Sequence, residues 1–146
     1  MNIILMKYMN KIILILIPLY LLTNIVFADT IKYNQYGQKQ GSYKQTSSGY
    51  NSYDKYGSKT GLYKKTSTGY NSYDKYGQKT GSYKKTSSGY DIYDKYGHKT
   101  GSYKKSSNGT ITSYDKYGRK TGSFKTDSSG KIIQYDKYGR KVGSYK

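Results

Sequence analysis

The chain has 146 residues, among them 22 tyrosines and 17 glycines, and it contains neither cysteine nor tryptophan. Its formal net charge of +18 comes from 26 lysines and arginines against 8 acidic residues, all of them aspartate. Without cysteine it has no disulfides and no lipoprotein anchor. With one histidine and no glutamate it has too few ligands for a transition-metal site.

Residues 1–28 have the layout of a secretory signal peptide. Two lysines precede an apolar run over residues 12–22 that only Pro18 interrupts, and residues 26–28 supply small side chains at the positions that a signal peptidase reads. We expect cleavage before Asp29, and therefore an exported protein that is secreted, periplasmic or held at the cell surface. The alternative is a retained membrane anchor, but a spanning helix needs about 20 apolar residues and this run is shorter.

Residues 29–146 are a tandem repeat. The motif Tyr-Asp-Lys-Tyr-Gly recurs at a spacing of 20 residues three times and then 21 residues twice, which defines six units including one degenerate copy. This region carries 24 lysines and arginines against 8 aspartates, a net charge of +16. We therefore expect one basic repeat domain over residues 29–146. The copies of the motif begin at Tyr33, Tyr53, Tyr73, Tyr93, Tyr114 and Tyr135.

Each unit is expected to form one β-hairpin. All 17 glycines keep fixed positions in the repeat, and glycine tolerates the positive φ that tight turns require. In one unit, residues 54–57 and 66–69 have the composition of tight loops that end in glycine, with strands expected at 59–64 and 70–73. The remaining glycine, Gly61, falls inside a strand, where we expect a tyrosine ring to lie against bare backbone.

Side-chain alternation predicts that Lys59, Gly61 and Tyr63 share one face of their strand. Phe124 replaces Tyr63 in another copy, so ring packing rather than the hydroxyl is expected to matter there. Leu62, which is serine in the other five copies, is expected to be exposed. No segment has a helical apolar period. The sequence therefore predicts an all-β fold of six hairpin units of 20–21 residues, as an open stack or a closed ring.

The same groups recur six times, so no single constellation of unlike catalytic residues exists. We therefore expect a non-catalytic protein with no cofactor, no metal and no small-molecule substrate. His98 occupies a turn position that differs in the other copies, and we expect it to be solvated. One aspartate in a turn, such as Asp54, is far from the oxygen cage that calcium needs. An Asx-type turn contact is the expected role of these aspartates.

The remaining candidates are tyrosines that precede lysines. Aromatic rings can stack on sugars or bases and lysines can pair with phosphates or uronates, and weak contacts that recur along a polymer add avidity. The alternative is that tyrosine forms the core and lysine its solvated rim. The candidate polymer-binding residues are Tyr43, Lys44, Tyr63, Lys64, Tyr83, Lys84, Tyr103, Lys104, Tyr145 and Lys146.

Three families of short hairpin repeats resemble this unit. The segment 135–144, preceded by 127–132, resembles the Tyr-Asp-x-x-Gly units of bacterial β-flower-type proteins, which implies a small all-β repeat domain. The unit length and its Tyr-Asp-x-x-Gly and Thr-Gly elements also resemble choline- and glucan-binding cell-wall repeats. The segment 57–63 is similar to MORN-type repeats. Together the resemblances imply an antiparallel hairpin array.

The sequence thus predicts a secreted or envelope-associated binding module for a repetitive anionic polymer, such as a cell-wall glycan, lipopolysaccharide or nucleic acid. No membrane span is expected once the signal peptide is removed. The alternative is a structural or adhesive surface protein that self-associates through unpaired hairpin edges. A third hypothesis is a Tyr/Gly/Ser-rich disordered chain that orders only on assembly.

Overall fold

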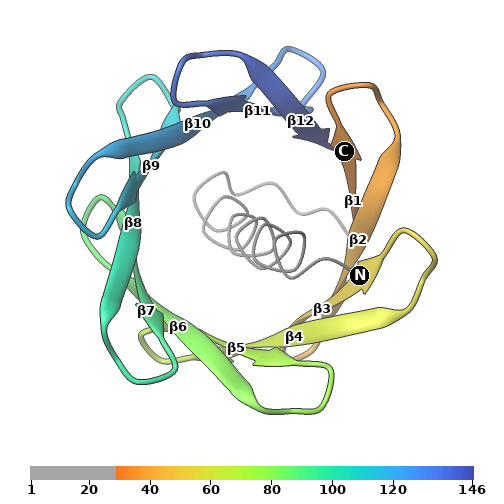
Figure 1. The fold of residues 1–146 in the computed structure, drawn as a ribbon, viewed down its shortest axis with the longest axis vertical. Coiled ribbons are helices and arrows are strands. Elements are labelled where there is room, and N and C mark those ends of the chain that lie inside the picture. The colour runs from red at the N-terminus through yellow and green to blue at the C-terminus, as the bar shows by residue number, and fades with distance from the viewer. Residues whose placement is uncertain (1–28) are drawn as a thin grey trace.

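The computed structural model describes residues 29–146, so the expected signal peptide lies outside the described residues. Twelve antiparallel strands form a single closed barrel in which each strand pairs with its neighbours in sequence and β1 pairs with β12 (Figure 1). The strands are β1 (Asp29–Asn34), β2 (Lys39–Thr46), β3 (Gly49–Asp54), β4 (Lys59–Thr66), β5 (Gly69–Asp74), β6 (Lys79–Lys85), β7 (Gly89–Asp94), β8 (Lys99–Lys105), β9 (Ile111–Asp115), β10 (Lys120–Thr126), β11 (Ile132–Asp136) and β12 (Lys141–Tyr145).

The barrel confirms the predicted all-β fold of six hairpin units, and of the two predicted arrangements it is the closed ring. Strands expected at 59–64 and 70–73 are β4 and β5, each slightly longer than predicted. No helix within residues 29–146 is long and apolar enough to span a membrane.

Two kinds of turn join the strands, one at each end of the barrel. The Asp-Lys-Tyr-Gly turns share one end, which we call the tyrosine rim and define by Tyr36, Tyr56, Tyr76, Tyr96, Tyr117 and Tyr138. The turns rich in serine share the other end, the serine rim, where the seam between β1 and β12 also reaches its last hydrogen bonds, between Ile31 and Lys146. This arrangement follows from the topology, because odd-to-even and even-to-odd connections of an up-and-down barrel lie at opposite ends.

The turns of the tyrosine rim are organised by their aspartates. Oδ1 of Asp54 accepts hydrogen bonds of 2.9 Å from the backbone N–H groups of Tyr56 and Ser58, and Gly57 adopts a positive φ of 87°. The predicted Asx-type contact is therefore confirmed. The same pair of contacts recurs at Asn34, Asp74, Asp94, Asp115 and Asp136.

A register shift follows each of these turns. Tyr53 pairs with Lys59 but Ser52 pairs with Gly61, which leaves Thr60 as the extra residue of a β-bulge. The Thr60 hydroxyl donates a hydrogen bond of 3.0 Å to Oγ of Ser52, so both hydroxyls lie on the same side of the sheet. The predicted alternation is therefore correct from Gly61 onwards and wrong at Lys59, because the bulge adds one residue between them.

Gly61 marks a close approach of backbone, as predicted, but the neighbour is not a ring. A Cβ atom at Gly61 would lie 2.5 Å from the carbonyl oxygen of Tyr73 on the adjacent strand, a separation that real Cβ atoms do not show. The expectation of a tyrosine ring against this glycine is therefore wrong, because the carbonyl group of the paired strand fills that space. Equivalent approaches of 2.5–2.7 Å occur at Gly41, Gly81, Gly101, Gly122 and Gly143.

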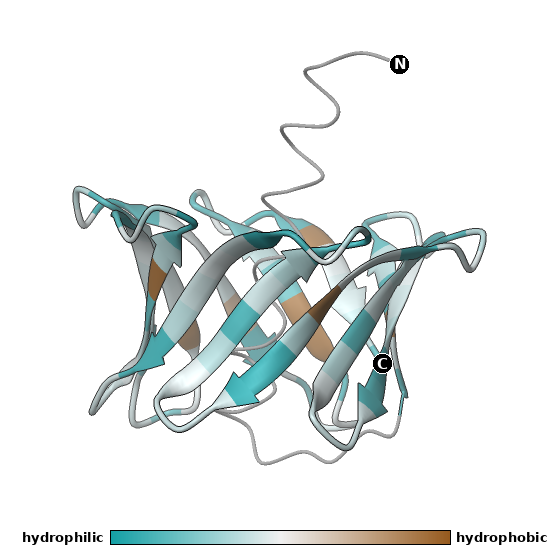
Figure 2. Ribbon diagram, turned by 90° about the horizontal axis from the view of Figure 1, so that it is seen from below, coloured by the Kyte–Doolittle hydropathy of each residue, from teal (hydrophilic) through white to brown (hydrophobic). Residues whose placement is uncertain are grey.

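Aromatic side chains form the core on the inner face. Tyr63 and Tyr83 lie with ring centroids 6.3 Å apart, and Phe124 lies 6.4 Å from both Tyr103 and Tyr145. Phe124 takes the tyrosine position without loss of packing, as predicted. Hydrophobic residues are sparse along the strands in Figure 2, so tyrosine supplies most of the core. The six equivalent buried residues are Tyr43, Tyr63, Tyr83, Tyr103, Phe124 and Tyr145.

Burial and mutual proximity raise the pKa values of the core tyrosines. Burial raises the pKa of Tyr83, and the proximity of Tyr63, Tyr103 and Tyr43 raises it further. Tyr83 is on β6 and Tyr43 on β2, which are not neighbours in the sheet. Both side chains are buried on the inner face of the wall.

The outer face is less exposed than the sequence indicates. Leu62 is half-buried rather than exposed, and Ser102, Ser123 and Ser144 at its position are buried. The expectation was wrong because it took no account of the adjacent strand. Leu62 pairs directly with Tyr73, and side chains of directly opposite residues lie next to each other on the same face of a sheet.

Candidate binding surface

The ten candidate residues divide between the two faces of the barrel wall. The tyrosines, of which Tyr63 is typical, are buried in the inner core, and the lysines that follow them, such as Lys64, are exposed. Consecutive residues of a strand point to opposite faces, so the two cannot form one surface. The buried set is Tyr43, Tyr63, Tyr83, Tyr103 and Tyr145, and the exposed set is Lys44, Lys64, Lys84, Lys104 and Lys146.

Four of the five candidate lysines, and Lys125 after Phe124, instead lie over a tyrosine of the next strand, whereas Lys146 follows the end of β12. Nζ of Lys44 is 5.7 Å from the ring centroid of Tyr53, and Nζ of Lys64 is 5.4 Å from that of Tyr73. These distances are within the range of cation–π attraction. We call this set the outer pairs: Lys44–Tyr53, Lys64–Tyr73, Lys84–Tyr93, Lys104–Tyr114 and Lys125–Tyr135.

Hairpin register could have found the outer tyrosines. In the ladder between β4 and β5, Leu62 pairs with Tyr73 and Lys64 pairs with Asn71, which puts Lys64 diagonally across from Tyr73 on the same face. Sequence adjacency paired each lysine with the wrong tyrosine. The positions of the turn glycines in the sequence would have been enough to predict the register of the two strands.

The tyrosine rim carries a second set of lysine–tyrosine contacts. Its six tyrosines are 70–81% exposed, far more than the other tyrosines of the wall. Nζ of Lys55 lies 4.8 Å from the ring centroid of Tyr56, and the guanidinium of Arg119 lies 5.1 Å from that of Tyr117. We call the lysine contacts the rim pairs: Lys55–Tyr56, Lys75–Tyr76, Lys95–Tyr96, Lys116–Tyr117 and Lys137–Tyr138.

Local chain geometry explains why the rim tyrosines project into solvent. Asp54 caps its turn through the N–H of Tyr56, two residues later, which holds Lys55 and Tyr56 at the tip of a tight loop. Side chains at such a tip have no neighbouring strand to cover them. These tyrosines were not among the predicted site residues, although their place directly before the turn glycine is a signal that the sequence contains.

The acidic residues of the motif are engaged within the turns. The N–H of Arg119 and its guanidinium, 2.7 Å from the carboxylate of Asp115, hold the pKa of Asp115 below its usual range. Arg140 does the same for Asp136.

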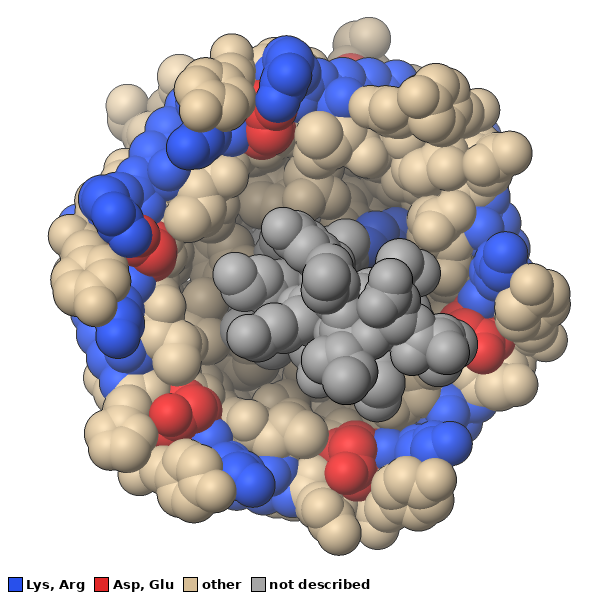
Figure 3. Space-filling model, viewed as in Figure 1, with Lys and Arg blue, Asp and Glu red and all other residues tan. Residues whose placement is uncertain are grey.

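Lysine and arginine side chains surround the circumference of the barrel in Figure 3, with the acidic groups interspersed among them. In this view the positive charge is spread around the ring rather than gathered on one side of it.

His98 is exposed, as predicted, and its Nδ1 lies 3.2 Å from Oδ2 of Asp94 in the turn. Within residues 29–146, no group of three or more histidine, cysteine, aspartate or glutamate side chains is placed to hold a metal ion.

No family model, curated protein or solved structure matches the chain.

Proposed function

We propose that the protein is a secreted or envelope-associated, non-catalytic binding module for a repetitive anionic polymer, such as a cell-wall glycan, lipopolysaccharide or nucleic acid. Export is the expectation drawn from residues 1–28, which lie outside the described residues. The net charge of +16 over residues 29–146 favours a polyanion, because such a surface attracts negative charge.

The observation that carries the proposal is the tyrosine rim. Six tyrosines are 70–81% exposed at one end of the barrel, and in five of them a lysine Nζ lies 4.8–4.9 Å from the ring centroid. Exposed aromatic side chains that gather at one end of a protein are typical of an interaction surface. An aromatic face beside an ammonium group offers stacking to a sugar or base and charge to its acidic substituent.

Repetition around the ring turns weak contacts into useful affinity. Each rim pair is one small site, and the barrel holds the five at fixed positions on one body. A polymer that engages one pair raises the local concentration of its next unit at the neighbouring pair. The likeness of the unit to choline- and glucan-binding cell-wall repeats supports a ligand in the cell envelope, and its likeness to β-flower-type proteins supports a small repeat domain.

Self-association as a structural or adhesive protein is the second proposal. Its physical basis was the unpaired edge of an open hairpin stack. In the described part of the chain every strand has two partners, because β1 pairs with β12. Only the exposed rim tyrosines would remain to hold copies together, so we rank self-association below polymer binding.

The test is co-sedimentation of the purified protein with isolated cell-wall sacculi, and retention on immobilised DNA, over a salt series. At about 1 M salt screening acts over about 3 Å, so charge alone no longer binds. We expect binding to one polymer to persist there and to disappear when Tyr76, Tyr96 and Tyr117 are all replaced by serine. Sedimentation velocity without polymer tests self-association in the same samples.

The matched control replaces Ser47, Ser67 and Ser87, which are exposed at the opposite rim, by alanine. This variant should bind like the wild type, since it leaves the lysines and tyrosines untouched. Absence of binding at low salt would refute the polymer proposal. Equal binding to both polymers that disappears with salt would reduce it to non-specific attraction.

A further inference from the structure

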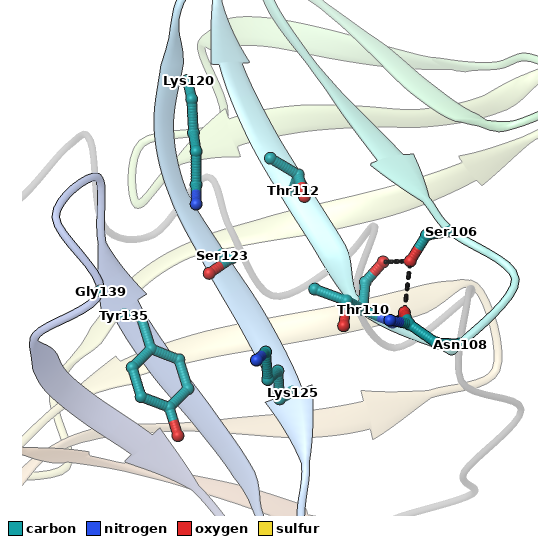
Figure 4. A pocket seen from close by; sticks show the side chains of 9 residues that line it. All are labelled: Ser106, Asn108, Thr110, Thr112, Lys120, Ser123, Lys125, Tyr135 and Gly139. Atoms are coloured by element: carbon teal, nitrogen blue, oxygen red, sulfur yellow. Dashed lines mark hydrogen bonds between the residues drawn. The ribbon is translucent and has the colours of Figure 1, made fainter.

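The outer wall is hollowed between β9, β10 and β11 into a groove of about 450 Å³ (Figure 4). This volume is within the range of about 300–1,000 Å³ that is usual for small-ligand sites. β10 contributes Lys120, Ser123 and Lys125 to the lining, and β9 and β11 contribute Thr112 and Tyr135. The groove is large enough for a sugar ring and carries both charged and hydroxyl groups.

A stiffened turn closes one end of the groove. The Ser106 hydroxyl donates a hydrogen bond of 2.6 Å to Oδ1 of Asn108, which also accepts the N–H of Thr110 at 3.0 Å. The backbone N–H of Ser106 bonds to the carbonyl of Thr110 at 2.9 Å. This turn belongs to the first of the two units with 21 residues and is one residue longer than the turn of a 20-residue unit.

The charge of the groove differs from that of its neighbour in the repeat. Asp91 stands where this groove has Thr112, and its carboxylate lies 2.7 Å from Nζ of Lys99, the counterpart of Lys120. That ion pair neutralises the lysine of the neighbouring copy. With Thr112 in place of the acid, the groove contains two lysines, and no acidic residue lines it.

Tyr135 provides the apolar surface of the groove. It is half-buried and pairs directly with Ser123, and Nζ of Lys125 lies 5.9 Å from its ring centroid. That distance is the longest among the outer pairs and is near the limit of about 6 Å for a cation–π contact. Lys125 therefore places a positive charge beside the ring of Tyr135 in the groove.

We propose that this groove binds one negatively charged sugar residue, a uronate or a sugar phosphate, with its anionic group between Lys120 and Lys125. The ring of the sugar stacks on Tyr135, and its hydroxyls bond to Thr112 and Ser123. A sugar fits better than a nucleic acid, because hydroxyl and amide groups dominate the lining and only one aromatic ring is present, whereas single strands stack successive bases. The inference rests on the proposed polymer-binding function and names the chemistry of one unit of that polymer.

The test is titration calorimetry of the purified protein with oligogalacturonate, glucose 6-phosphate, methyl-esterified oligogalacturonate and oligothymidylate. We expect the acidic sugars to bind, with the tighter of the two identifying the anionic group, and the neutral ester to bind at least about tenfold more weakly. Thr112→Asp, which copies the neutralised neighbour, should weaken acidic-sugar binding at least about tenfold. Lys125→Gln should do the same without adding an acid.

The matched control is Asn51→Asp, the same type of change at the corresponding position of the wall near β4, which should leave this affinity unchanged. Unaltered binding in both Thr112→Asp and Lys125→Gln, equal binding of the ester, or tighter binding of oligothymidylate that depends on Thr112 would overturn the assignment. If the wild type binds neither acidic sugar yet still sediments with polymer, the groove assignment alone fails. Loss of both kinds of binding would refute the proposed function as well.

Discussion

The hydroxyl of Tyr145 donates a hydrogen bond of 2.9 Å to Oε1 of Gln134 on the inner face of the last hairpin. Tyr83 occupies the equivalent position on β6, but its buried hydroxyl has no hydrogen-bond partner among the described residues. Two tyrosines in one repeat position thus differ in whether their polar atom is satisfied.

We expect Tyr83→Phe to leave the free energy of unfolding unchanged or raise it by up to about 1 kcal/mol, because it removes an unsatisfied buried group. Tyr145→Phe should lower it by about 1 kcal/mol, since Gln134 loses its donor. Urea denaturation of the two variants measures both effects. A larger loss for Tyr83→Phe than for Tyr145→Phe would contradict the assignment of these contacts.

Gly61 and Gly57 should respond differently to the same substitution. Alanine at Gly61 would place its Cβ 2.5 Å from the carbonyl oxygen of Tyr73, so the strands must separate, at a cost of about 2–3 kcal/mol. At Gly57 a Cβ meets nothing within 4 Å, and only the φ of 87° opposes it, at about 1 kcal/mol. The midpoint temperature of thermal unfolding should therefore be much lower in the Gly61→Ala variant than in the Gly57→Ala variant. The reverse order would refute the close approach at Gly61.

Alkaline pH should destabilise the barrel. Burial raises the pKa of five core tyrosines, whereas unfolded tyrosine ionises near pH 10. Above that pH the folded state holds protons that the unfolded state releases, so stability falls as pH rises. Lys32 acts in the opposite direction, because burial lowers its pKa to about 8, but it is one group against five. The five tyrosines are Tyr43, Tyr63, Tyr83, Tyr103 and Tyr145.

Absorbance titration at the tyrosinate band, combined with circular dichroism, measures this effect. We expect a late group of tyrosines to ionise only as the β-sheet signal disappears. Tyr83→Phe should reduce that late group by one residue and leave the earlier part of the curve unaltered. Complete ionisation with the sheet signal intact would show that the core tyrosines are accessible.

Acid should loosen the turns of the tyrosine rim. The pKa of Asp115 and of Asp136 lies below the usual value, so their contribution is present above about pH 4 and is lost as pH falls through the folded pKa. The double variant Asp115→Asn, Asp136→Asn should show a smaller drop in stability between pH 7 and pH 3. Asparagine keeps the cap, as Asn34 does in the first unit. An unchanged acid dependence would show that these carboxylates do not contribute.

The hairpins could be predicted from sequence because their determinants are local. The glycine after Tyr56 and the aspartate before it define a tight turn within a few residues, and the period repeats that information six times. Closure could not be predicted in the same way. It depends on strand tilt and on bulges such as Thr60, which are properties of the whole sheet.

The site was predicted in part. Lys44 and its equivalents are on the surface, as the sequence indicated, but their tyrosine partners are on the adjacent strand. Side-chain alternation along a strand puts Tyr43 and Lys44 on opposite faces, so this error could have been avoided from the sequence. The groove at Tyr135 could not be foreseen, because its lining comes from three neighbouring strands and from a turn that is one residue longer than in most copies.

The seam between β1 and β12 has a consequence for how this gene can change. Near-identical repeats readily gain or lose a copy by recombination, and in an open array each such event would simply lengthen or shorten the protein. Here the last strand must meet the first, and barrel diameter grows with strand number. A gain or loss of one copy would therefore change the strand number by two and the barrel diameter with it, and the new last strand would again have to pair with β1.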